Sequence, residues 1–141
     1  MEHVTSKDGT SIAFDRLGTG APVVLVSGGS VDRTSNASLA AELASDFTVL
    51  NYDRRGRGPS GDTPPYAIER EIEDIEAVIG AAGDDASLYG SSSGAVLAML
   101  AFGARLDGAP IPTEGIRAIE PVDHAFAERF GYVVKQLALA R

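Results

Sequence analysis

Five small residues, Gly90-Ser91-Ser92-Ser93-Gly94, stand directly between two apolar segments. Ala86–Tyr89 before them predicts a short strand, and Ala95–Ala104 after them, apolar nearly all round, predicts a buried helix. A serine at a sharp strand-to-helix turn has a strained backbone and needs small neighbours two positions away on each side. Ser92 alone meets that spacing, so we expect its hydroxyl to be exposed. The alternative is that the run is a flexible loop or a helix cap.

The remaining chain alternates between segments typical of strands and helices. Predicted strands are His3–Ser6 and Thr10–Leu17 as a hairpin, then Pro22–Val26, Phe47–Tyr52 and Ile116–Ile119; predicted helices are Asn36–Ser45, a stretch with Ile68, Ile72, Ile75 and Ile79 at helical spacing that closes at Gly83, and Phe126–Leu139. This order predicts an α/β fold, a mostly parallel sheet with helices on both faces. We expect one domain over residues 1–141, in which 122–141 form a terminal helix that is a cap remnant or an oligomer contact.

Composition narrows the class of protein. The chain has 141 residues, no cysteine and a net charge of −8. Disulfides and thiolate metal sites are excluded, and an acidic surface argues against nucleic acid and anionic membranes as partners. The first residues show no basic region followed by an apolar run, and no apolar run approaches about 18 residues, so we expect neither a leader peptide nor a membrane span. We therefore expect a cytoplasmic protein with no metal, no nucleic-acid partner and no membrane segment.

Two further segments accompany the serine turn in a familiar order. Val23–Gly29 is a strand that runs into a glycine turn, and Asp53-Arg54-Arg55-Gly56-Arg57-Gly58-Pro59-Ser60 follows the next buried strand. With Gly90–Gly94, they resemble the α/β-hydrolase-fold family over roughly Val4 to Pro121. We interpret the Asp53–Ser60 segment as a shaping loop without chemistry, in which Asp53 is a cap, the glycines bend the chain and the arginines pair locally.

The resemblance implies a function. Ser92 would be the nucleophile of a hydrolase that acts on a small ester, thioester or related acyl compound without a cofactor. The backbone N–H groups of Gly29 and Ser93 would hold the oxyanion, although an ordinary glycine turn is the alternative for Gly29. The family also includes lyases, peroxidases and enzymes with a carboxylate nucleophile, and serine at position 92 argues against the last group.

The family's triad follows the chain order serine, acid, histidine. His124 is the candidate base and Glu120 the candidate acid, because both follow the strand Ile116–Ile119. Alternatively, Asp123 caps the terminal helix with His124 in its first turn, and Glu120 is a solvated carboxylate. The other histidine, His3, is expected on the surface of an edge strand.

The family is longer than this chain, so we expect a fold truncated after the sixth strand. An open strand edge and uncovered helix faces would then favour a homodimer or higher oligomer. Two other interpretations stay open. The chain is a catalytically impaired hydrolase-like domain that acts as a binding or assembly module, or it is an incomplete product. The residues do not identify the substrate.

Overall fold

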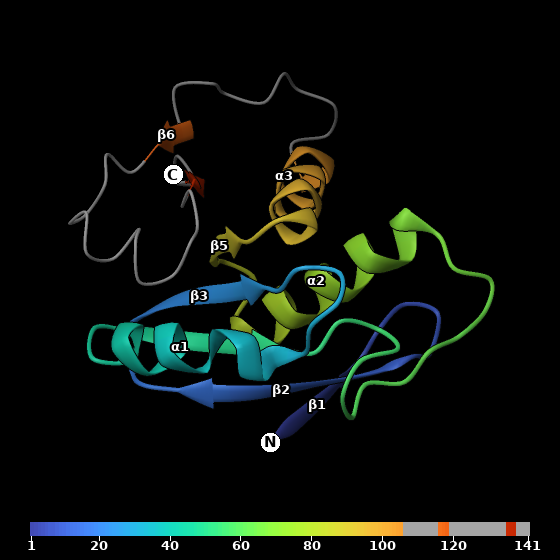
Figure 1. The fold of residues 1–141 in the computed structure, drawn as a ribbon, viewed down its shortest axis with the longest axis horizontal. Coiled ribbons are helices and arrows are strands. Elements are labelled where there is room, and N and C mark those ends of the chain that lie inside the picture. Colours follow the sequence, from blue (N-terminus) through green and yellow to red (C-terminus); the bar gives the residue numbers. More distant parts are fainter. Residues whose placement is uncertain (106–115, 119–134, 138–141) are drawn as a thin grey trace.

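A computed structural model describes residues 1–105, 116–118 and 135–137, with side chains over residues 1–104. The described strands form one sheet in the order β1-β2-β4-β3-β5-β7-β6 (Figure 1). The elements are β1 (Glu2–Thr5), β2 (Ser11–Leu17), β3 (Ala21–Val26), a 3-10 turn (Arg33–Asn36), α1 (Ala37–Leu43), β4 (Phe47–Tyr52), α2 (Ile68–Ala82), β5 (Ser87–Gly90), α3 (Ser93–Arg105), β6 (Ile116–Ala118) and β7 (Lys135–Leu137).

The sheet is mixed, and its parallel part lies at the centre. β3 pairs in parallel with β4 on one side and with β5 on the other. α1 joins β3 to β4 and α2 joins β4 to β5, because parallel neighbours need a crossover connection. β1 and β2 form the predicted antiparallel hairpin, and β2 continues antiparallel to β4. The predicted α/β fold is therefore confirmed, but the predicted mostly parallel sheet is not. Of the six described strand pairings, the two made by β3 are parallel and the other four are antiparallel.

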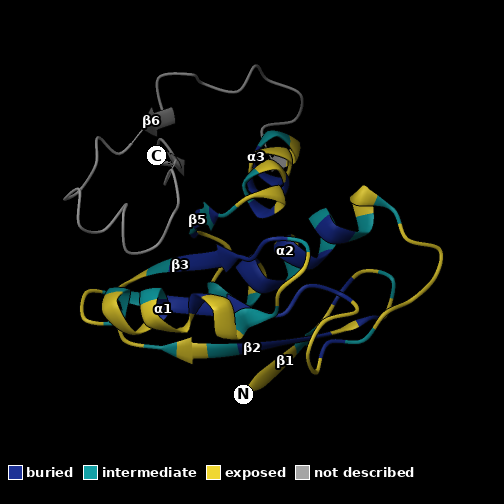
Figure 2. Ribbon diagram, viewed as in Figure 1, coloured by how far each residue is buried: buried dark blue, intermediate teal, exposed yellow. Residues whose placement is uncertain are grey.

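Helices cover both faces of the sheet, as predicted. Val23 and Leu25 of β3 pack with Val49 and Ala40 on the α1 side. The alternate side chains of the same strand, Val24 and Val26, pack in the larger cluster with α2 and α3 on the opposite face. Successive side chains of a strand point to opposite faces, so a strand covered on both sides must be apolar throughout. Figure 2 shows β3 buried along most of its length.

α3 is less buried than its sequence predicts. Leu97, Ala98 and Ala101 pack in the core, but Val96, Met99 and Leu100 are 57%, 36% and 41% exposed. An apolar sequence shows only that every side of a helix can be buried. Which sides are buried depends on the strands and helices that pack against it. Across the described residues, no helix is both long and apolar enough to cross a membrane.

The C-terminal prediction needs a correction. Lys135–Leu137, which we expected inside a terminal helix, forms β7 and pairs antiparallel with both β5 and β6. An unpaired strand edge presents free N–H and C=O groups, and β7 covers part of the β5 edge, where Leu137 pairs with Leu88. The strand predicted at Ile116–Ile119 is confirmed over Ile116–Ala118 and lies at the sheet edge. The remainder of the predicted terminal helix lies outside the described residues.

Candidate functional site

The serine run forms a tight turn between β5 and α3. Ser92 has a φ of +52° and an exposed side chain. Non-glycine residues rarely adopt this left-handed conformation, so the backbone of Ser92 is strained. Two hydrogen bonds hold the turn: Gly94 N donates to Ser91 O at 2.8 Å, and Ala95 N donates to Ser92 O at 3.0 Å. The predicted strand–turn–helix geometry with an exposed Ser92 is therefore present, and Ser92 directly precedes the first residue of α3.

The two flanking glycines are required by close backbone contacts. A Cβ on Gly94 would lie 2.3 Å from the carbonyl oxygen of Val26, and a Cβ on Gly90 would lie 2.5 Å from the Cα of Ala95. Both distances are far shorter than van der Waals contact. The turn is thus folded back against the end of β3 and against the first turn of α3, and only glycine fits at the second position before and after Ser92.

The chain that leaves β3 runs alongside this turn. A Cβ on Gly28 would lie 3.5 Å from Ser92 Cβ, and a Cβ on Gly29 would lie 3.2 Å from Ser93 Oγ. Ser93 is the first residue of α3, and the first N–H groups of a helix have no partner within it. The positive end of the helix dipole lies at the same place. The segment with Gly29 and the start of α3 therefore face each other next to Ser92.

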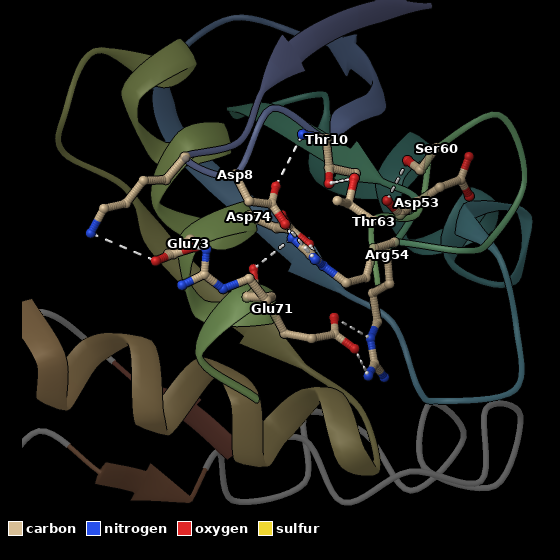
Figure 3. A network of polar contacts seen from close by, with 12 residues as sticks. Asp8, Thr10, Asp53, Arg54, Ser60, Thr63, Glu71, Glu73 and Asp74 are labelled. Atoms are coloured by element: carbon tan, nitrogen blue, oxygen red, sulfur yellow. Dashed lines mark hydrogen bonds and ion pairs between the residues drawn. The ribbon is translucent and has the colours of Figure 1, made fainter. Parts of the chain in front are cut away.

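Arg54 reaches this turn from the loop after β4. Its Nη1 lies 3.0 Å from Ser93 Oγ and 3.4 Å from the carbonyl oxygen of Ser27. The other two nitrogens face Glu71 of α2, with Nε 3.0 Å from Oε2 and Nη2 against Oε1 (Figure 3). Burial is the largest single influence and disfavours the charge on Arg54, but the hydrogen bonds and the Coulombic attraction to Glu71 together raise the pKa of Arg54. A permanent cation therefore contacts the first residue of α3.

Arg55, the next residue, points to a different part of the fold. It binds Asp74 through Nε at 2.8 Å and Nη2 at 2.7 Å, and its Nη1 lies 2.9 Å from Asp8. Our prediction that the arginines pair locally is therefore wrong. Glu71 and Asp74 are three residues apart on α2, so they occupy one face of that helix and meet successive arginines. The packing of α2 on the sheet brings these partners together.

The other parts of this loop are partly as predicted. Gly56 and Gly58 have positive φ angles and bend the chain. Asp53 does not act as the predicted cap: its carboxylate accepts from the backbone N of Arg33 at 2.7 Å and from the Arg33 guanidinium. The carbonyl of Asp53 accepts from Ser60 Oγ at 2.7 Å and so closes the loop. An ion pair with a residue 20 positions earlier thus replaces the local cap.

A neutral phenol interacts electrostatically with the Arg54–Glu71 pair. Tyr52 is the last residue of β4, and its side chain is fully buried. Burial and the neighbouring Glu71 carboxylate raise the pKa of Tyr52 well above 10.0. Tyr52 therefore stays protonated at neutral pH and adds no negative charge below the site.

Of His3, His124 and Glu120, the residues considered as base or acid from the sequence, the structure describes His3 alone. His3 is exposed on β1, with Nδ1 3.1 Å from Ser11 Oγ, and is a surface residue as predicted. His124 and Glu120 lie outside the described residues. Within the ranges that the structure describes, no group of three or more histidine or acidic side chains is arranged to hold a metal ion.

Comparison with known proteins identifies the family. The sequence profile of the alpha/beta hydrolase family matches residues 23–140. The chain belongs to the alpha/beta hydrolase family. It is 33% identical over 95 residues to the uncharacterized hydrolase YraK of Bacillus subtilis, a match that spans 64% of this chain and 35% of that protein.

Solved structures agree with this assignment. An alpha/beta hydrolase from Sphaerobacter thermophilus is 59% identical with a TM-score of 0.72, over 73% of this chain and 40% of that one. A thermophilic esterase from Thermogutta terrifontis is 32% identical with a TM-score of 0.66, over 74% of this chain and 40% of that one. This alpha/beta hydrolase chain thus spans less than half the length of the proteins that it resembles.

Sequence reasoning missed one residue of the site. It assigned no chemistry to the loop after β4, whereas Arg54 of that loop contacts Ser93. A signal was present: two consecutive arginines follow a buried strand, and the helix after them carries five acidic residues, among them Glu71 and Asp74 three positions apart. That pattern indicates paired ion bridges, but the sequence does not show which arginine reaches the serine turn.

Proposed function

We propose that this chain is a serine hydrolase that acts on a small ester, thioester or related acyl compound through Ser92. The observation that carries the proposal is the conformation of Ser92, exposed at a φ of +52° between two glycines that admit no side chain. A fold retains a strained residue only where the surrounding contacts enforce it, and such residues cluster at functional sites. The 32% identity to an esterase supports an acyl substrate.

The proposed reaction has two steps. Ser92 Oγ bonds to the acyl carbon and its proton passes to the base; the alcohol or thiol then leaves with a proton, and water releases the acid from the acyl-serine. The N–H groups of Gly29 and Ser93 stabilise the oxyanion in both steps. His124 is the proposed base and Glu120 the proposed acid. No cofactor takes part in this scheme.

A fluorophosphonate probe tests the nucleophile. Ser92 Oγ bonds to phosphorus, fluoride leaves, and the protein gains the mass of the phosphonyl group. We expect mass spectrometry to place the adduct on Ser92 and to find none in Ser92→Ala. Ser91→Ala is the matched control, because Ser91 shares the turn but has an unfavourable spacing to the glycines; this variant should still be labelled. An adduct that persists in Ser92→Ala would refute the assignment.

The base is tested separately with His124→Ala. Loss of a triad base lowers kcat by several orders of magnitude, on the order of 10⁴-fold or more. Turnover of a p-nitrophenyl ester is the measurement, and His3→Ala is the control with unchanged turnover. Wild-type turnover in His124→Ala would remove His124 from the mechanism and leave Ser92 as nucleophile.

A second candidate function is a hydrolase-like binding or assembly module without turnover. It is favoured by the position of the one described histidine, His3, on β1, which β2, β4 and β3 separate from β5 and the serine turn. An assembly role goes with the homodimer or higher oligomer that we also propose. If wild-type protein gives neither an adduct nor ester turnover but light scattering shows a dimer, this candidate replaces the hydrolase. A monomer at micromolar concentration contradicts the assembly role.

A further inference from the structure

Arg54 bridges two backbone segments that belong to the proposed oxyanion hole. One contact is to Ser93 Oγ, on the residue whose own N–H is a proposed donor. The other is to the carbonyl of Ser27, two residues before Gly29, whose N–H is the second donor. The two segments come from the end of β3 and the start of α3, which are more than 60 positions apart in the chain. A single Arg54 nitrogen, Nη1, contacts both.

The position of that nitrogen is fixed from behind by Glu71. Both carboxylate oxygens of Glu71 bind the Nε and Nη2 edge of the guanidinium. The guanidinium is planar and rigid, so a bidentate partner on one edge determines where the remaining nitrogen lies. Glu71 is 3% exposed and is carried by α2, which is packed into the core. Nη1 is therefore held at a defined place between Ser27 and Ser93.

We propose that Arg54 is a positioning residue for the oxyanion hole, which sets the separation of the Gly29 and Ser93 N–H groups by linking the two segments that carry them. The inference rests on the proposed function. Donors act only when they lie within about 3 Å of the developing oxyanion, so a small increase in their separation lowers the transition-state stabilisation. Arg54 touches neither substrate nor reacting atoms in this scheme and acts through Ser93 and Ser27.

Arg55 provides a built-in comparison. It makes the same bidentate contact with an acid of α2, Asp74, but its other contacts are the carboxylate of Asp8 and the carbonyl of Arg70. None of these belongs to the serine turn. An effect of Arg54 that came only from a buried ion pair would be shared by Arg55, whereas a positioning effect would not.

The test replaces each pair with apolar residues of similar size. Arg54→Met/Glu71→Leu removes the bridge without leaving a buried charge, and such exchanges often keep or raise stability. We expect this variant to keep its melting temperature to within a few degrees. Its kcat on a p-nitrophenyl ester should fall about tenfold or more with little change in KM, because a misplaced donor loses part of the 10²-fold or larger effect of a missing one.

The matched control is Arg55→Met/Asp74→Leu. Its kcat per folded molecule should stay within about twofold of wild type. The rate of phosphonylation of Ser92 is a second measurement on the same samples, since the attack on phosphorus places negative charge on an oxygen in the same hole. We expect this rate to fall in the Arg54 pair variant by a factor similar to that for kcat, and to be unchanged in the control.

Ser93 variants give a second, milder test that does not disturb the buried pair. Ser93→Ala removes the oxygen that Nη1 contacts, whereas Ser93→Thr retains it. We expect Ser93→Ala to lower kcat about threefold and Ser93→Thr to restore part of the loss. Adding Ser93→Ala to Arg54→Met/Glu71→Leu should lower kcat no further, because the contact is already absent. A fully additive loss would contradict the bridge.

The outcomes separate this inference from the proposed function. If wild-type protein reacts at Ser92 and the folded Arg54 pair variant reacts equally fast, the positioning role is overturned and the function stands. If both pair variants lose rate equally, the effect belongs to general packing and the positioning role is again overturned. If wild-type protein takes up no probe, the proposed function fails, and this inference fails with it.

Discussion

Arg54 and Arg55 are neighbours in the chain, and each binds an acid on α2, yet they stabilise different parts of the molecule. The Arg55 side chain is 1% exposed and joins α2 to the β1–β2 turn through Asp74 and Asp8. The Arg54 side chain is 10% exposed and links Glu71 to the serine turn through Ser93. Figure 3 shows the Arg54–Glu71 contact set apart from the cluster around Asp74 and Asp8.

The difference teaches what a repeated ion pair does in a fold. A buried pair gains little net stability over apolar residues of similar size, but loss of one partner is costly because the other charge is left unpaired. Single substitutions in either pair are therefore expected to be destabilising. Only the pair whose third nitrogen faces the site is in a position to influence reactivity. Four substitutions would break or sharpen this contrast.

The largest expected effect is that of Arg55→Met on stability. Asp74 is fully buried and would lose its bidentate partner, so the free energy of unfolding should fall by about 4 kcal/mol. Urea denaturation measures the loss. The fraction that remains folded should label at Ser92 with the wild-type rate constant. A slower rate constant in that fraction would show that the two arginines do not have separate roles.

The second largest effect is expected for Gly94→Ala. Its new Cβ would overlap the Val26 carbonyl and lower the free energy of unfolding by about 3 kcal/mol. Labelling of Ser92 should be abolished, because the turn itself changes shape. Gly80→Ala in α2 is the control: its Cβ has open space apart from Asp84 at 3.6 Å, and it should stabilise by about 0.5–1 kcal/mol.

Ser93→Ala should cost about 1 kcal/mol of unfolding free energy, the net value of one hydrogen bond to a charged donor near the surface. Thermal unfolding by circular dichroism is the measurement. Glu2→Gln, which removes the exposed ion pair with Arg16, is the control and should change stability by less than about 0.5 kcal/mol. A loss of several kcal/mol in Ser93→Ala would indicate a structural role for the hydroxyl that the Arg54 contact does not explain.

The smallest expected effect is a change in stability at acid pH. The hydrogen bond from Arg55, then those from Thr10, lower the pKa of Asp8 from its ordinary value of 3.8. Because the folded-state pKa is depressed, this stabilisation is complete above pH 3.8 and is lost as the pH falls below it. Asp8→Asn should therefore be less stable than wild type at pH 6, and the difference should shrink toward pH 2. A constant difference in urea midpoints over this range would contradict the assignment.

Much of the fold was predictable because periodicity and small residues are local signals. The apolar run at Pro22–Val26 and the isoleucine spacing from Ile68 to Ile79 each predicted an element within a residue or two of its observed ends. The turn around Ser92 was predictable for the same reason, since the glycines that it needs lie two positions away. The strand at Lys135–Leu137 was not, because pairing with β5 depends on an edge far away in the sequence.

The sequence alone therefore determined the alternation of strands and helices, the site of the sharp turn and the residue at its centre, since backbone strain and apolar patterning act over a few neighbours. Tertiary structure alone decided which arginine meets Ser93, which side of α3 stays exposed and how Gly29 faces the turn. Those outcomes depend on where α2 packs and where β3 ends relative to β5. Such distances are set by the whole sheet and are not contained in any single segment.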